Sequence, residues 1–587
     1  MKYEITGNWK NGFKNDAVLF FSQSIEKLLN PNTDHVHCVS VLNAYSLLYE
    51  YLEAFDLVRK GMIDKKHLDF ISDEIWETLG QDVIVNCILK KTEILAIKQK
   101  FSAVPFEEKK SVILYLVNQL YKFNEIAKNY LLENIKKEKN KTELYLGLKS
   151  YLPYLIGGGY SEDFIYNYNK KIFKSGKEIS INTVETFLTK FDFVNQRFTV
   201  ILPVDLEIKQ FQAILEKRLS VSFNTPSKFI EGFHYDTDRY ILISASVEEL
   251  DSNQASIRVM NNLALFTRYY KFFSQSTKPF FGKSCIVIDD ESGERNFIKI
   301  RRNGLVYLSE EAEISKLQIG ETAEGVITSL MTYENNVFPV IDKAIMNYTN
   351  AYENKHLESS FLNFWAVLES LCEKKDISKI MQIEDNILPI LSKDYYAMIF
   401  EALLRDVTDN IPKNQLEGFF NTYFNKSSIN NLDFINLILL DEYKDARIEL
   451  NSFLEKYPVI RYNIFAINKR YEKLNSVKKD IERFETRLKW HLRRLYRARN
   501  TIIHSGETPK HLQYLTKHLM EYTSQVLIEI LFNLTIREDI NNVESLFIDV
   551  ELFNSTIKTY LSKESKKNIT REDIAFLVSY EEKMNAN

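Results

Sequence analysis

The chain has 587 residues, of which 45% are hydrophobic and 27% charged, so it is long enough for about two to four domains and has the composition of a globular protein. The formal net charge of −4 excludes a uniformly basic nucleic-acid binder, and any such contact requires a local basic patch. The cysteines form no CxxC pair, which excludes a disulfide framework and a cysteine zinc site; they are Cys38, Cys87, Cys285 and Cys372.

The sequence predicts a cytoplasmic protein that does not contact the membrane. Its first residues, "MKYEITGNWKNGFKND", contain no apolar stretch of the kind that secretion signals need. No uncharged apolar run approaches the length of a membrane span, and even "QVLIEILFNL" is interrupted by Glu529. The wide spacing of the cysteines also fits a reducing compartment.

The pattern along the chain predicts a mainly α protein in three parts. Apolar residues recur every three or four positions from about residue 15 to 155, which predicts an N-terminal helical region, 1–156. The glycines at 157–159 break this rhythm, and the boundary is placed there. A mixed α/β domain, a possible sensor, is expected at 157–334. Helices return in a C-terminal part, 335–587.

Short segments rich in β-branched and aromatic residues predict the strands of the middle domain. They are "RFTVILPVDL" (197–206), "RLSVSF" (218–223), "DRYILISASV" (238–247) and "SCIVIDDESGERNFIKIRR" (284–302), the last read as two strands around a Ser-Gly turn. Helices are expected between them at 210–219 and 257–273, and a late capped helix is expected in "ITREDIAFLVSYEEK".

Several common sites are absent from the sequence or weakly supported. The triple glycine lacks a following Lys-Ser/Thr and is read as a hinge or a loop rather than a phosphate loop. His35, His37 and Cys38 have no second cluster to complete a zinc site. No metal site and no cofactor are therefore predicted.

One segment offers a metal-dependent alternative. Asp192, Glu207 and Lys209 resemble the spaced acids and lysine of magnesium-dependent nucleases. Asp205 and Glu207 also follow a strand and precede a helix, where acidic residues simply favour the helix N-terminus. The interpretation as acids at a helix N-terminus is preferred.

The stretch "RRLYRARNTIIHSG", 493–506, raises the main question. On a helix, Leu488, Leu492, Leu495 and Ile502 form one apolar stripe, and Arg499 falls near its centre. An arginine cannot lose its charge, so a buried guanidinium needs a partner.

The end of this helix carries a candidate proton-transfer group. His504 is expected in the last turn, where the helix dipole favours its charged form. Gly506 would cap this helix, and Pro509 would start the next one. Spacing alone leaves open whether Arg497 or Arg499 acts with the histidine, and Asn500, a polar neighbour, favours Arg499.

The other face of the same helix is basic. Lys489, Arg493 and Arg497 lie together there with His504 on ideal geometry, which suits contact with RNA phosphates. The simpler interpretation is a solvated charged face, and both remain open.

"YRARNTIIHSG" resembles the Arg-polar-(three to five residues)-His signature of HEPN domains, and "HLESSFLNFWAVLESLCEK" is similar to the opening helix of the Apea-like HEPN subgroup. The resemblance covers about residues 340–535 and implies a helical bundle with an insertion at about 376–480. Phe361 and Trp365 would be core residues. Glu369 would be either a partner behind Arg499 or a solvent residue.

The resemblance implies a metal-independent endoribonuclease. His504 would handle the proton of the RNA 2′-hydroxyl, with Arg499 stabilising the charge on phosphorus and Asn500 beside it. A homodimer through the C-terminal domain would pair two motifs, and the charge of Arg499 would be met by the partner's helix and by phosphate. A bacterial anti-phage or toxin-like effector, controlled by a phage-derived or cellular trigger, is expected. The alternative is a non-catalytic HEPN module that binds RNA or protein.

Overall fold

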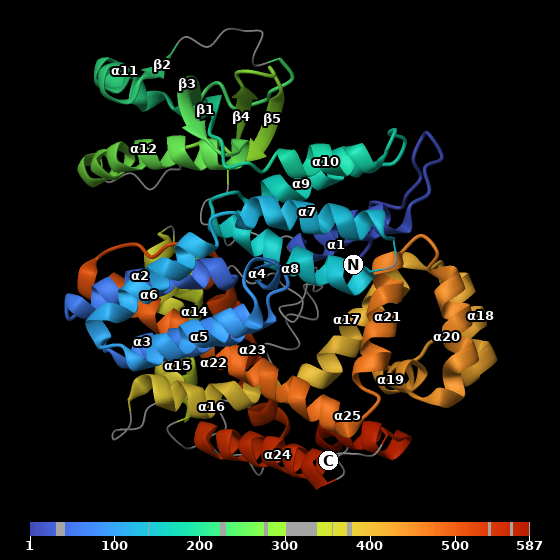
Figure 1. Ribbon diagram of the computed structural model, residues 1–587. Helices are drawn as coiled ribbons and strands as arrows, with labels where there is room; N and C mark the ends of the chain where they lie inside the picture. Colours follow the sequence, from blue (N-terminus) through green and yellow to red (C-terminus); the bar gives the residue numbers. More distant parts are fainter. Residues whose placement is uncertain are drawn as a thin grey trace.

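The computed structural model describes residues 1–30, 42–138, 140–223, 231–274, 280–300, 337–354, 356–372, 378–537, 542–563 and 568–585. Across these residues the protein is mainly helical, as predicted, and has a five-stranded antiparallel sheet (Figure 1). No helix in the described ranges is both long and apolar enough to cross a membrane.

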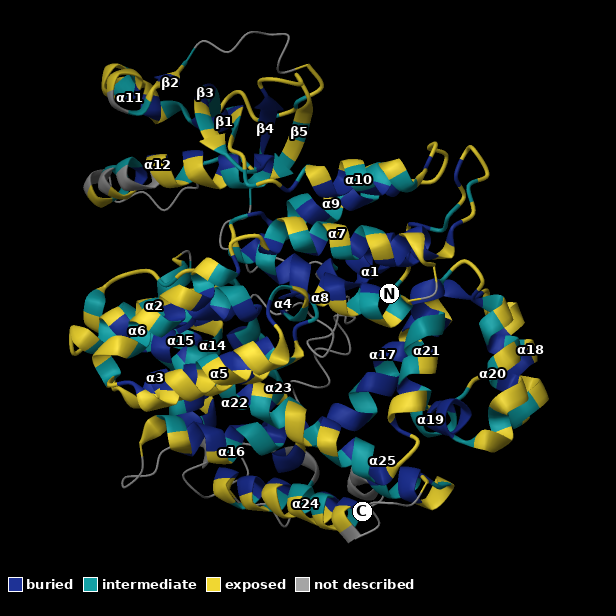
Figure 2. Cartoon of the chain, in the orientation of Figure 1, coloured by how far each residue is buried: buried dark blue, intermediate teal, exposed yellow. Residues whose placement is uncertain are grey.

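The N-terminal region is a helical unit built around α1, which is buried along almost its whole length. Figure 2 shows how the helices around it turn buried faces inward and exposed faces to solvent. The helices are α1 (Asp16–Leu29), α2 (Ala44–Arg59), α3 (Lys66–Gln81), α4 (Val85–Ile88), α5 (Lys91–Ala103), α6 (Phe106–Gln119), α7 (Phe123–Lys136), α8 (Lys141–Gly157), α9 (Glu162–Phe173) and α10 (Ile181–Thr189).

This helical region continues beyond the predicted boundary at 157–159. Phe173 and Phe191 belong to the same apolar core as α1, so the change of architecture comes at residue 196. The glycines end α8 and allow a close approach, because a Cβ at Gly158 would lie 2.1 Å from the ring of Phe193. They therefore make a turn within one unit.

The sheet lies beyond this point and has the order β2-β3-β1-β4-β5. All the strands predicted from the sequence are present, and α12 packs across one face of the sheet (Figure 1). The elements are β1 (Gln196–Asp205), a 3₁₀ turn (Leu206–Phe211), α11 (Gln212–Leu219), β2 (Val221–Ser222), β3 (Tyr240–Glu249), α12 (Ser252–Ser274), β4 (Ser284–Asp289) and β5 (Arg295–Lys299). The predicted end of this domain, at 334, lies outside the described residues.

A second apolar core forms the C-terminal bundle. Phe361 and Trp365 are fully buried in it, as predicted, on the helix that carries the family resemblance. The helices of this bundle are α14 (Val337–Glu353), α15 (Leu357–Leu371), α16 (Lys379–Lys393), α22 (Leu474–Ser505), α23 (Leu512–Ile536) and α24 (Val543–Lys563).

The segment between α16 and α22 packs elsewhere. Its apolar residues join the core of the N-terminal region, together with α25, whose start is capped by Thr570 and Asp573. The segment expected to be an insertion, 376–480, includes α16, and α16 packs in the core of the bundle. The helices of the segment are α17 (Tyr395–Asn410), α18 (Lys413–Phe424), α19 (Asn431–Leu439), α20 (Lys444–Phe453) and α21 (Pro458–Arg470), and α25 spans Arg571–Asn585.

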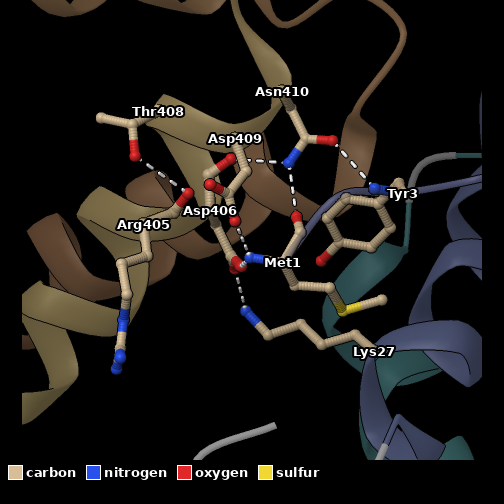
Figure 3. Close-up of polar contacts among 8 residues, drawn as sticks. All are labelled: Met1, Tyr3, Lys27, Arg405, Asp406, Thr408, Asp409 and Asn410. Carbon is tan, nitrogen blue, oxygen red and sulfur yellow. Dashed lines mark hydrogen bonds and ion pairs between the residues drawn. The ribbon is translucent and has the colours of Figure 1, made fainter. Parts of the chain in front are cut away.

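Polar contacts fasten the first residues of the chain to α17 (Figure 3). The ammonium of Lys27 lies 2.6 Å from Asp406 Oδ2, and both side chains are buried. Nearby, the backbone N–H of Tyr3 donates to Asn410 Oδ1 at 2.9 Å. Because a buried charge needs its partner, these contacts fix how α17 sits on α1.

Asp406→Ala should destabilise the protein by about 3–5 kcal/mol, because it takes the carboxylate from a buried ammonium. The measurement is the midpoint of urea unfolding. Asp409→Ala, which removes a half-exposed carboxylate on the same helix, is the control and should cost less than about 1 kcal/mol. A loss at Asp406 no larger than that at Asp409 would refute the structural role of the buried pair.

Candidate active site

The helix α22 carries the candidate motif and belongs to both helical cores. Leu474 and Val477, in its first turns, lie in the N-terminal core, whereas Leu488, Leu492 and Leu495 lie in the bundle core. Its 32 residues therefore form a single rod between the two units.

The end of α22 agrees in part with the prediction. Gly506 adopts the left-handed conformation, with φ of 66°, and its N–H donates to Ile502 O at 3.1 Å. The prediction that Pro509 starts the next helix is wrong, because α23 begins only at Leu512. The intervening loop is instead held against α15, where Thr508 Oγ1 donates to Glu358 Oε1 at 2.7 Å.

Arg499 is 22% exposed at the edge of the bundle and is paired within the chain. Its Nη2 lies 3.4 Å from Glu369 Oε1, and its Nη1 donates to Asn500 Oδ1 at 3.2 Å. Trp365 Nε1 also donates to Glu369 Oε1, at 2.9 Å, and so orients that carboxylate. The arginine thus has a partner on α15, and of the two roles that the sequence left open for Glu369 the structure shows the contact with Arg499.

His504 is exposed in the last turn of α22. It follows Arg499 by five positions, which corresponds to about 140° around an ideal helix. The two side chains therefore leave the helix in different directions. One motif by itself does not direct both groups at the same phosphate.

The basic face predicted for RNA contact is neutralised by carboxylates. Arg493 Nη2 donates to Glu384 Oε2 at 3.0 Å, and Lys489 Nζ lies 3.3 Å from the same oxygen. The guanidinium of Arg493 also lies over the ring of Phe70, 3.4 Å from its centroid. Both cations thus link α22 to α16, and Arg493 also contacts α3.

Arg497 is only 6% exposed and forms an ion pair with Glu50 of α2. The neighbouring Arg494 donates from Nε to both carboxylate oxygens of Glu50 at 3.1 Å, and from Nη2 to Glu74 Oε2 at 2.6 Å. Glu50, Glu74, Arg494 and Arg497 are called the arginine–glutamate cluster below. It joins the N-terminal region to the motif helix.

The two carboxyl groups of this cluster respond differently to the same arginines. Burial by itself would raise the pKa of Glu50, but Arg494 and Arg497 outweigh burial and lower that pKa. For Glu74 burial prevails, and its pKa is raised despite the contact with Arg494. The carboxylate form of Glu50 is therefore the one that the interface favours.

Nothing in the sequence marked the arginine–glutamate cluster. Arg494 is separated by 444 residues from Glu50, and no local pattern links two acids on different helices to a distant arginine. The only available signal was the density of arginines on α22, for which RNA contact and a solvated surface were the two interpretations considered.

The metal-dependent alternative gains no geometric support. Asp192 pairs with Lys128, and the backbone N–H of Glu207 donates to Asp205 Oδ1 at 3.1 Å, which is the helix-start role preferred from the sequence. The described part of the chain brings no three His, Cys, Asp or Glu side chains together as metal ligands. His35, His37 and Cys38 lie outside it.

Comparisons with protein-family models, with curated proteins and with solved structures found no match for this chain. The HEPN resemblance rests on α15 and α22 alone.

A pH dependence follows from His67, which is 7% exposed and packs against Tyr496 of the motif helix with ring centroids 5.7 Å apart. Burial, aided by Arg497, lowers the pKa of His67 to about 4. Between this value and the ordinary value of about 6.5 the unfolded chain holds the extra proton, so stability is lost as the pH falls through that window.

His67→Phe should keep the ring packing and reduce the fall in Tm between pH 7 and pH 5, measured by differential scanning fluorimetry. Some slope should remain, because burial also lowers the pKa of His491. Substitution of the exposed His234 by Phe is the matched control and should leave the slope as it is. An identical slope in both variants would contradict the assignment.

Proposed function

We propose that the protein is a metal-independent endoribonuclease of the HEPN kind that acts in the bacterial cytoplasm and needs no cofactor. The observation that carries this proposal is the arrangement at the end of α22. A guanidinium held by Glu369 remains partly exposed at Arg499, and His504 projects from the last turn of the same helix.

The proposed site is completed by a second copy of the chain. Because Arg499 and His504 leave α22 in different directions, two motif helices around a two-fold axis are needed to bring one residue of each kind to a single phosphate. Ile503, next to His504, is 47% exposed and offers apolar surface for such a contact. The homodimer is thus part of the proposed mechanism.

The chemistry requires only these side chains and the RNA itself. One His504 takes the proton from the 2′-hydroxyl while the 2′-oxygen bonds to the adjacent phosphorus. The bond between phosphorus and the 5′-oxygen breaks, and the protonated His504 of the other copy gives its proton to the leaving 5′-oxygen. Arg499 stabilises the charge that develops on the phosphoryl oxygens, and Asn500 helps to orient its guanidinium. The products are a 2′,3′-cyclic phosphate and a 5′-hydroxyl.

The N-terminal region is proposed to restrain this activity. Its carboxylates at Glu50 and Glu74 engage Arg494 and Arg497 on the motif helix, and Glu53 pairs with Lys510 in the loop that follows. A defence or toxin-like effector needs such a restraint until a trigger arrives. This contact is a candidate for the element that a trigger changes.

The alternative is a HEPN module that binds RNA or a protein partner without cleaving. The contact of Arg499 with Glu369 favours this alternative, because an arginine that is paired within its own bundle can stabilise the fold without taking part in catalysis. Cleavage assays on single variants separate the two functions.

His504→Ala should lower cleavage of total RNA at least about 100-fold, because it removes the proton-transfer group. Arg499→Ala should lower it comparably, and Arg483→Ala, at an exposed position of the same helix, is the control. The measurement is gel analysis of the RNA with and without EDTA, plus detection of a 2′,3′-cyclic phosphate and the oligomeric state by light scattering. Wild-type cleavage by His504→Ala, or full activity in a monomer, refutes the site.

Glu50→Gln should raise cleavage activity several-fold, because it removes the negative charge that holds Arg494 and Arg497. This variant is a sharper test than a fragment starting at residue 335, since such a fragment would expose the apolar faces of α17–α21. Asp73→Asn, an exposed acid beside Glu74, is the control. The measurement is the initial rate of RNA cleavage at equal protein concentration. Equal cleavage rates in the two variants would contradict the proposed restraint.

A further inference from the structure

A cavity of about 1120 Å³ lies between the two helical cores. Its walls come from α2, α3 and α8 of the N-terminal region and from α22 and α23 of the bundle. The arginine–glutamate cluster forms part of one wall, whereas Arg499 and His504 do not line the cavity. The volume is that of a small-molecule site rather than of a packing defect.

Two cations on different helices line this cavity. Lys149 lies on α8 and Arg487 on α22, and both are solvent-accessible. Among the described residues neither forms an ion pair with a carboxylate. Carboxylates line the same cavity, and four of them are paired with cations: Glu50 and Glu74 with Arg494, Glu53 with Lys510, and Asp56 with Lys110.

Two arginines and one carboxylate act on the ammonium of Lys149. Arg487 and Arg470 repel its ammonium, and Asp480 is the carboxylate that attracts it. Asp480 is already engaged, because Tyr395 OH donates to it at 3.1 Å and Arg470 Nη1 lies 3.6 Å away. Enclosure by protein together with these cations lowers the pKa of Lys149 to about 8. An incoming anion would relieve the repulsion.

Aromatic side chains line the cavity beside α8. Tyr45 and Tyr49 of α2 share a hydroxyl contact of 3.1 Å, and the rings of Tyr154 and Phe193 meet edge to face at 5.3 Å. Such a wall packs against flat or apolar groups, while the cations hold an anionic one.

We propose that this cavity binds a small phosphorylated molecule, with Lys149 and Arg487 holding its phosphate from two sides. The ligand then bridges α8 to α22 and ties the two cores together, so binding stabilises the folded chain. This inference does not rest on the proposed nuclease activity.

The test is isothermal titration calorimetry of the full chain with inorganic pyrophosphate and, separately, with ATP, both without magnesium at pH 8.5. At least one of them should bind with a Kd below about 1 mM. Lys149→Met and Arg487→Met should each weaken binding about tenfold or more, whereas Lys90→Met, at an exposed site outside the cavity, should not. Tighter binding of ATP than of pyrophosphate would show that the aromatic wall contributes to the affinity. Equal binding of the two would show that the affinity comes from the phosphate groups alone.

Proton uptake distinguishes the proposed contact from diffuse charge attraction. Lys149 is partly neutral at this pH, and a bound phosphate favours its charged form, so wild-type protein should take up more protons on binding than Lys149→Met. Titrations in two buffers of different ionisation enthalpy measure the difference. Absence of binding by both probes, equal affinity in wild type and both cavity variants, or equal proton uptake would overturn the proposal.

Discussion

The structure depends above all on the charged contact between Glu50 and the two arginines of the motif helix. Arg494 and Arg497 approach one carboxylate, and Glu74 completes the group. Buried charges of this kind contribute specificity more than stability, because their desolvation offsets much of their attraction. Removing any one member, however, leaves a charge without its partner. The docking of the N-terminal region on α22 is thereby limited to one arrangement.

The contact affects both helical cores, because α22 belongs to both of them. The N-terminal core also contains α17–α21 and α25, so the bundle is assembled from segments on either side of residues that pack elsewhere. Neither core can therefore be excised as a continuous stretch of chain. A change at the arginine–glutamate cluster acts on the same rigid rod that ends in His504.

Local features were predictable from the sequence, and distant partners were not. The strands, the buried Trp365 helix and the Gly506 cap follow from short-range patterns of apolar, β-branched and glycine residues. The helical wheel placed Arg499 inside and Arg497 outside, whereas the side chain of Arg497 is the more buried, at 8% exposed against 22% for Arg499. A single apolar stripe reveals one buried face, but α22 is covered on a second side by α2 and α3, which lie more than 400 residues earlier.

The same electrostatics limits how the proposed restraint can be released. Separating α2 from α22 would leave Arg494 and Arg497 without carboxylates, and a guanidinium cannot discard its proton to escape that cost. Release is therefore favoured when another anion, or water at a newly opened surface, replaces Glu50 and Glu74. The phosphates of RNA are such anions in the proposed reaction, and they would then meet a basic helix face that the closed arrangement hides. In the proposed function, the RNA and the N-terminal region would compete for the same two arginines, so that RNA binding would require release of the restraint.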